Sequence, residues 1–181
     1  MPKSTRLLPL ICAAALAASA PAQADPDHHA CRLKGSYGYV YDGTSYTPSG
    51  PVALSETGFF AFAHDGSASS EGTLTFQFTD FGGTGPIWLT LKEVLSNITV
   101  TPEPGNPCHG AISFQATATV TKTSDPSRAP AGLVLFTNSP RSLAYTISGK
   151  RNDIITVIST SPGTIASGTA YKQSRQAQRR H

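Results

Sequence analysis

Residues 58–78, GFFAFAHDGSASSEGTLTFQF, contain the pattern that decides the fold of this chain. In the second half, Leu74, Phe76 and Phe78 alternate with threonine and glutamine, which is the period-two pattern of a strand with one dry and one wet face. The Asp-Gly pair at 65–66 predicts the reversal between the two halves. In the first half, Phe59, Phe60 and Phe62 do not show which face of the strand points inward. A hairpin this rich in phenylalanine cannot bury its own apolar side chains, so further strands must cover it.

The rest of the chain repeats the same pattern at spacings of about ten residues. The alternation predicts strands at 33–41, 52–62, 72–78, 87–91, 94–101, 112–121, 132–137, 143–148, 154–159 and 165–171. Helix formers are scarce outside the N-terminus, and the connections are mostly of hairpin length. We therefore predict an all-β fold, an antiparallel up-and-down β-barrel of eight to ten strands. A sandwich of the immunoglobulin type is disfavoured because Trp88 lies far from Cys31 in sequence.

The N-terminus predicts export. Residues 1–24 have a basic start, an apolar stretch at 7–18 and the small-x-small cleavage sequence Ala22-Gln23-Ala24, as in a cleavable signal peptide. The apolar stretch is too short for a permanent membrane anchor, and no later stretch reaches the ~20 apolar residues of a spanning helix. Lipidation at Cys12 is disfavoured because bulky Ile11 precedes it. We expect a secreted or periplasmic protein with no transmembrane anchor and one β-barrel domain at 25–172.

Export decides how the cysteines are interpreted. Cys12 would leave with the signal peptide, so Cys31 and Cys108 remain, and two cysteines in an oxidising compartment usually pair. A disulfide closing so long a loop contributes roughly 4 kcal/mol in the chain-entropy model. The alternative, a reactive thiol or a metal site at Cys108-His109, lacks a second ligand motif.

The charge of the chain argues against a nucleic-acid partner. The net charge of +3 falls to about +1 once the signal-peptide residues Lys3 and Arg6 are excluded, and no basic stripe follows the predicted strands. The one local excess is the tail at 173–181, which we interpret as a disordered, solvated end. The alternative interpretation is that the basic tail binds an anionic surface.

Four turn and strand motifs come in an order that suggests a family. They are GSYGY at 35–39, ETGFF at 56–60 before Asp65-Gly66, PCHG at 107–110 and GTIASGTAYKQ at 163–173. With them the chain resembles a family of small exported bacterial proteins, similar to the calycin-like barrel of allene oxide cyclase and dirigent proteins. The resemblance covers nearly the whole chain after residue 24. It implies a calycin-like fold and transfers no catalytic residue.

The polar residues give no catalytic set. His64 beside Asp65 is a possible general base, but a solvated turn accounts for both residues. Asp42, Asp65, Glu56 and Glu71 are carboxylates that a glycosidase would need in pairs, and sequence cannot set their separation. The remaining histidines lack metal-ligand spacing, and no nucleophile elbow or phosphate loop is present. We therefore expect no catalytic residue, no metal and no cofactor.

The aromatic side chains are the remaining functional lead. An eight-stranded barrel can hold one small ligand, so aromatic residues on strands either fill the core or line a cavity. The candidates for cavity lining are Tyr37, Tyr39, Phe60, Phe62, Phe76, Trp88 and Phe114. They suggest a binding module for a small apolar molecule. The alternatives are a cyclase or isomerase that acts by confinement, which the family resemblance implies, and a non-catalytic interaction protein of the cell envelope.

Overall fold

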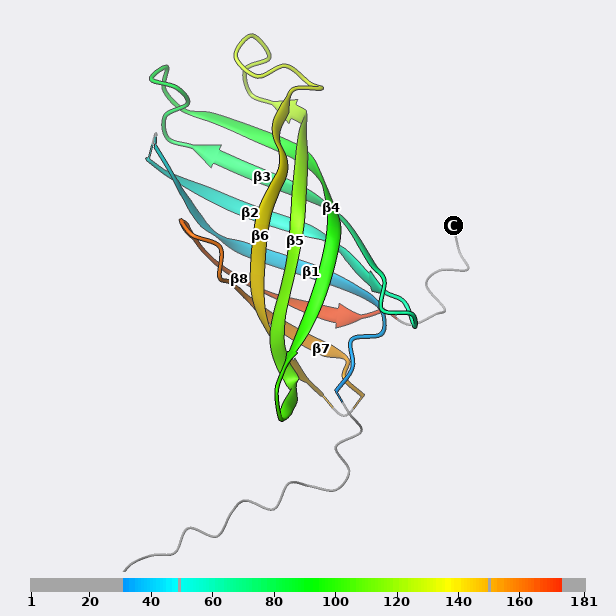
Figure 1. Cartoon of the computed structure of the whole chain (residues 1–181). Helices are drawn as coiled ribbons and strands as arrows, with labels where there is room; N and C mark the ends of the chain where they lie inside the picture. The colour runs from blue at the N-terminus through cyan, green and yellow to red at the C-terminus, as the bar shows by residue number, and fades with distance from the viewer. Residues whose placement is uncertain (1–30, 49, 150, 174–181) are drawn as a thin grey trace, which may run out of the picture.

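A computed structural model describes residues 31–48, 50–149 and 151–173, and every regular element in these residues is a β-strand. The strands are β1 (Gly35–Thr47), β2 (Gly50–Phe62), β3 (Ala68–Phe78), β4 (Ile87–Glu103), β5 (Asn106–Thr123), β6 (Val134–Ser148), β7 (Ile154–Ser159) and β8 (Thr164–Lys172) (Figure 1). The predicted signal peptide at 1–24 and residues 174–181 of the predicted tail lie outside the described residues. The described part of the chain contains no apolar helix long enough to cross a membrane.

The eight strands form one closed barrel in sequence order, and β8 closes it by pairing with β1. Every neighbouring pair is antiparallel. The predicted antiparallel barrel is thereby confirmed, and closure excludes the sandwich. Closure also leaves the sheet without two free edges, which is how a small all-β protein avoids edge-to-edge association.

Two predicted breaks are absent. Residues 87–91 and 94–101 belong to the single strand β4, because Lys92 faces outward and Glu93 faces inward without interrupting the alternation. Residues 132–137 and 143–148 were likewise predicted as two strands, and the structure joins them in the single strand β6, which begins at Val134. Pro140 lies in the first half of β6, beyond the β6–β7 ladder, which covers Leu143–Ser148.

The hairpin of β2 and β3 settles the orientation that the sequence left open. Phe60 and Phe62 face the interior, whereas Phe59 lies outside with 45% of its surface exposed. At the turn, the Asp65 carboxylate accepts hydrogen bonds from the backbone N–H of Ser67 at 2.9 Å and from its hydroxyl at 2.7 Å. These bonds hold the pKa of Asp65 below its usual value, so Asp65 acts as a turn former.

The barrel interior contains two apolar clusters. One includes Phe60, Leu95, Leu143 and Val157, and the other includes Leu54, Leu74, Phe76 and Leu91. Tyr41 and Phe136 pack against both clusters. Two buried glutamates occupy the level between them, and this level positions the candidate site described below.

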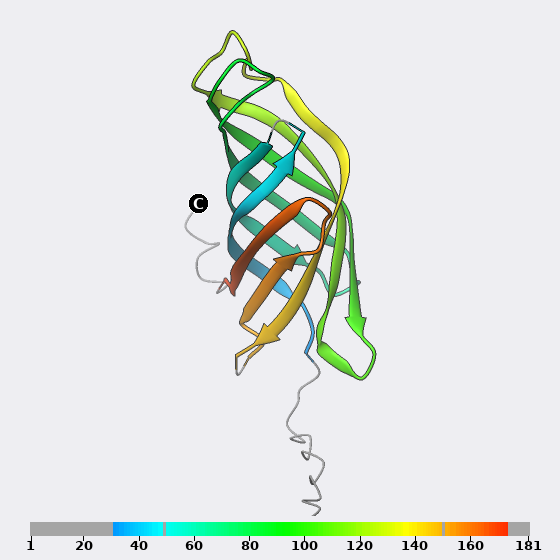
Figure 2. The same ribbon diagram turned by 90° about the vertical axis from the view of Figure 1, so that its left-hand side faces the viewer.

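Cys31 and Cys108 form a disulfide whose Cα atoms are 4.8 Å apart and whose cysteines are 77 residues apart in sequence. The bond attaches the segment before β1 to the start of β5. It therefore fastens the long β4–β5 hairpin, which extends past the body of the barrel, to the N-terminal side of the domain (Figures 1 and 2).

Candidate functional site

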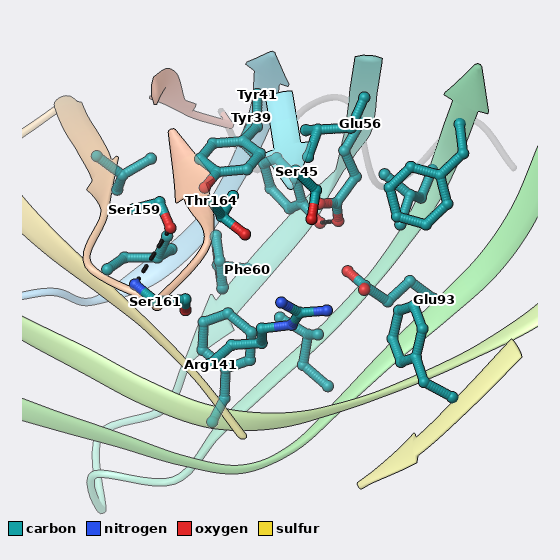
Figure 3. Close-up of a pocket in the computed structure, with 18 residues that line it drawn as sticks. Tyr39, Tyr41, Ser45, Glu56, Phe60, Glu93, Arg141, Ser159, Ser161 and Thr164 are labelled. Atoms are coloured by element: carbon teal, nitrogen blue, oxygen red, sulfur yellow. Dashed lines mark hydrogen bonds between the residues drawn. The ribbon is translucent and has the colours of Figure 1, made fainter. Parts of the chain in front are cut away.

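A cavity of about 70 Å³ lies inside the barrel between the two apolar clusters (Figure 3). Its apolar wall is formed by Leu54, Phe60, Leu74, Phe76, Leu95, Phe114, Phe136, Leu143 and Val157. Its polar wall is formed by Tyr39, Tyr41, Ser45, Glu56, Glu93, Arg141, Ser159, Ser161 and Thr164. Apolar side chains with a few converging polar groups are the usual composition of a small-molecule site.

The cavity extends to the part of the barrel wall where β6 is not paired with β7. The ladder between β6 and β7 covers Leu143–Ser148, so the first half of β6 stands away from β8 and the end of β1 (Figure 2). Residues from both sides of this gap line the cavity, with Phe136 and Arg141 on β6 opposite Ser45 and Thr164. The Thr164 hydroxyl is buried without a hydrogen-bond partner among the described residues.

Two glutamates meet at the centre of the cavity. Glu56 on β2 and Glu93 on β4 both occupy inward positions of their strands, and only 9% and 6% of their surfaces are exposed. Their carboxyl groups hydrogen-bond to each other, and the Tyr39 hydroxyl donates a second hydrogen bond to Glu56 Oε1. The two carboxyls point into the space between the apolar walls (Figure 3).

Two glycines make room for this cluster. Gly58 and Gly72 face each other across the β2–β3 ladder, and Gly72 is also opposite Glu93 on β4. A Cβ atom on Gly72 would lie 2.6 Å from the Tyr39 hydroxyl and 2.7 Å from Glu56 Oε1, closer than real Cβ contacts. A residue with a side chain at Gly72 would therefore displace the hydrogen-bonded pair.

Burial and mutual repulsion raise the pKa of the glutamates above the usual value of a carboxyl group. Burial first, and then the charge of Glu56, raise the pKa of Glu93 to about 9. Burial also raises the pKa of Glu56, but hydrogen bonds from Tyr39 and Glu93 and the charge of Arg141 oppose this shift. The pKa of both carboxyls is raised, so the pair favours holding a proton at neutral pH. One carboxyl can donate a proton while its neighbour accepts one.

Arg141 is the cation of the site. Its guanidinium lies over the Phe136 ring, 5.3 Å from the ring centroid, and points toward the carboxyl pair in Figure 3. Its charge opposes the rise that burial causes in the pKa of both glutamates. Within the described residues, ion pairs closer than 4.0 Å join Lys92 to Glu71 and Arg128 to Asp125, and none involves Arg141. The guanidinium therefore interacts with the pair across the cavity.

Four of the predicted cavity-lining residues, Tyr39, Phe60, Phe76 and Phe114, lie on the cavity wall. Tyr37 and Phe62 are buried in the apolar cluster beside the cavity, where their rings pack edge to face. Trp88 requires a correction. It is 46% exposed on the outside of β4, because Ile87 and Leu89 on either side of it occupy the inward positions.

Sequence reasoning missed Glu93 and Arg141 and considered Glu56 only with the wrong partners. Asp42, Asp65 and Glu71 are exposed and line no part of the cavity, and the partner of Glu56 is Glu93. The available signal was a glutamate in phase with the apolar face of a strand, as in Leu89, Leu91, Glu93 and Leu95. The two carboxyls hydrogen-bond directly, whereas glycosidase carboxyls stand at least ~5 Å apart, so the glycosidase hypothesis has no support here.

The histidines do not extend the site. The His109 ring lies 3.2 Å from the Thr146 hydroxyl, and its neighbour Cys108 is in the disulfide. In the described ranges, no group of three or more histidine, cysteine, aspartate or glutamate side chains could hold a metal ion.

The chain matches no protein-family model, no curated protein and no solved structure.

Proposed function

We propose that this barrel binds a small, largely apolar molecule that carries one polar group. The observation that supports the proposal is a mixed cavity, in which apolar walls surround a buried carboxyl pair and a guanidinium. A barrel whose interior served stability alone would gain by filling this space with apolar side chains, because a buried charged cluster rarely stabilises a fold. The cluster instead offers hydrogen-bonding groups that would orient a ligand.

The size of the cavity limits the ligand. About 70 Å³ is well below the ~300–1,000 Å³ of pockets for drug-sized molecules. The ligand is therefore a small molecule, or a larger one whose end enters while the remainder extends through the gap beside β6. Burial of its apolar part contributes about 25 cal/mol for each Å² removed from water.

The direct test is mass spectrometry of lipophilic extracts from the protein purified from its own compartment. We expect a small molecule that copurifies with the wild type and is lost from Leu54→Phe and Val157→Phe, which narrow the cavity from opposite clusters. Phe59→Leu on the outer surface is the control and should retain the molecule. Circular dichroism establishes that each variant folds. Extracts of the wild type that hold no molecule, or variants that retain it, would refute the proposal.

A second function, isomerisation or cyclisation by confinement, is favoured by the shared proton of the carboxyl pair. Ionised Glu56 would accept a proton from a carbon of the substrate, and protonated Glu93 would return one at another atom, so the substrate changes neither its charge nor its composition. The test is incubation of the extracted molecule with the protein in D₂O. Deuterium incorporation by the wild type and not by Glu56→Gln would support catalysis, and its absence in both would leave binding alone.

The same proposal includes the fold family and the location. The sequential antiparallel order of eight strands is compatible with a calycin-like barrel, and the Cys31–Cys108 bond suits an oxidising compartment. We propose a secreted or periplasmic protein whose chain begins at Asp25 after cleavage. Cell fractionation and N-terminal sequencing test this part. A non-catalytic envelope interaction protein would be indicated if the first experiment finds no ligand.

A further inference from the structure

We propose that the polar group of the ligand is a cation, so that the barrel takes up a small, largely apolar amine. This inference rests on the proposed binding function and specifies its ligand class. Three features of the cavity support it: the count of charges, the aromatic walls and the position of Arg141.

The charge count leaves room for one more positive charge. Two carboxyls and one guanidinium face the cavity, so the fully ionised set carries a net charge of −1. Among the residues that the structure describes, no other lysine, arginine, aspartate or glutamate lines it. Without a ligand, a bound proton neutralises this negative charge. An ammonium group beside Glu56 and Glu93 would neutralise it instead and form charge-assisted hydrogen bonds. A carboxylate ligand would instead bring the net charge of the fully ionised site to −2.

The walls suit a cation as well. Aromatic rings of Tyr39, Tyr41, Phe60, Phe76 and Phe114 line the cavity around the carboxyl pair. The faces of aromatic rings carry partial negative charge and attract ammonium groups, more strongly where water is excluded. The same rings would cover the apolar part of an amine.

Arg141 does not fill the place of this cation. Its guanidinium lies over the Phe136 ring, and within the described residues it forms no ion pair closer than 4.0 Å with a carboxylate. Arg141 comes from the half of β6 beyond the β6–β7 ladder and is only half-buried. An amine that enters beside it meets the guanidinium at the opening and the two carboxyls at the centre.

Binding should release a proton. The titratable and charged groups that face the pair are Tyr39 and Tyr41 on β1, the two glutamates themselves and Arg141 on β6. Burial raises the pKa of both tyrosines above their usual value, so neither ionises near neutral pH, and Arg141 remains charged. Only the carboxyl pair can supply the proton. The affinity for an amine should therefore rise from pH 6 to pH 8.

The experiment compares ligands of one shape and different charge on the full mature chain. Benzylamine, benzyl alcohol and benzoate, with butylamine, butanol and butyrate as a smaller series, are added during thermal unfolding and isothermal titration calorimetry. We expect the amines to bind most tightly. Titration in buffers of different ionisation enthalpy should detect up to one proton released for each amine bound.

Two variants identify the groups that act. Glu93→Gln preserves the shape of the side chain but leaves Glu56 balanced by Arg141, so amine binding should weaken roughly tenfold to a hundredfold. Arg141→Gln removes the fixed cation, and amine binding should be as tight as in the wild type or tighter. Circular dichroism checks that both variants fold.

The outcomes separate this inference from the proposal on which it depends. Equal binding of alcohol and amine, tighter binding of the acids, or an unchanged amine affinity in Glu93→Gln would overturn the cationic ligand and leave a ligand-binding barrel. Stabilisation by none of the probes, together with extracts that hold no molecule, would overturn both.

Discussion

Replacing Glu93 with glutamine should change how the stability of the protein depends on pH. The pKa of this carboxyl is 4.5 in the unfolded chain and about 9 in the barrel. Between these values the folded protein holds a proton that the unfolded chain has released. The free energy of unfolding therefore falls as pH rises, by about 1.4 kcal/mol for each pH unit when one full proton is involved.

The magnitude follows from the interval. Between pH 6 and pH 8 the wild type should lose roughly 2–3 kcal/mol through this group, a large part of the 5–15 kcal/mol typical of a domain. The stabilising contribution is complete below about pH 4.5 and is lost as the pH approaches 9. Glu93→Gln does not titrate at this position and so should lose the part of the slope that Glu93 contributes, while its amide can still donate to Glu56.

Urea denaturation followed by circular dichroism at intervals between pH 5 and pH 9 measures both slopes. Glu71→Gln is the matched control, because Glu71 pairs with Lys92 at 2.9 Å on the surface and half of its side chain is exposed. Its removal should leave the slope unchanged, since exposed ion pairs contribute little. If the wild type and Glu93→Gln show the same slope, Glu93 does not carry a buried proton and the reasoning about the pair fails.

Three further predictions follow from the packing. Gly72→Ala should destabilise the fold by about 1–3 kcal/mol, because the new methyl group would displace the Tyr39 hydroxyl. Urea denaturation measures this loss, and a stability equal to that of the wild type would contradict the prediction. Replacing Cys31 and Cys108 with serine should cost about 4 kcal/mol, since the bond spans 77 residues, and a loss below about 1 kcal/mol would show that it constrains little. Trp88, the single tryptophan, should emit at the wavelength of a solvated indole in the native protein and be quenched by iodide, and a blue-shifted, protected emission would return it to the interior.

Most of the fold could be predicted from local pattern. Alternating polar and apolar residues recur along the chain because a strand places successive side chains on opposite faces. The turn at Asp65-Gly66 likewise depends on a few adjacent residues. The errors concern continuity, as at Lys92-Glu93, where two separate strands were predicted and a single strand continues.

The candidate site could be predicted only in part. Aromatic residues on the predicted strands indicated that some of them line the interior. The sequence could not distinguish Phe60, which faces inward, from Trp88, which faces outward, because the inward face of each strand was unknown. Periodicity assigns two faces to a strand without stating which faces the barrel axis. That choice is made when the closing pair of β8 and β1 fixes the interior.

The sequence by itself determined the all-β class, the hairpin order and the two cysteines available for a bond. Only the folded barrel brings the side chains of Glu56 and Glu93 together and turns Arg141 toward them in one cavity (Figure 3). The physical reason is that the three side chains come from β2, β4 and β6, which are far apart along the chain. Their approach depends on strand register and on the space left at Gly58 and Gly72, and neither is a property of a local stretch of residues.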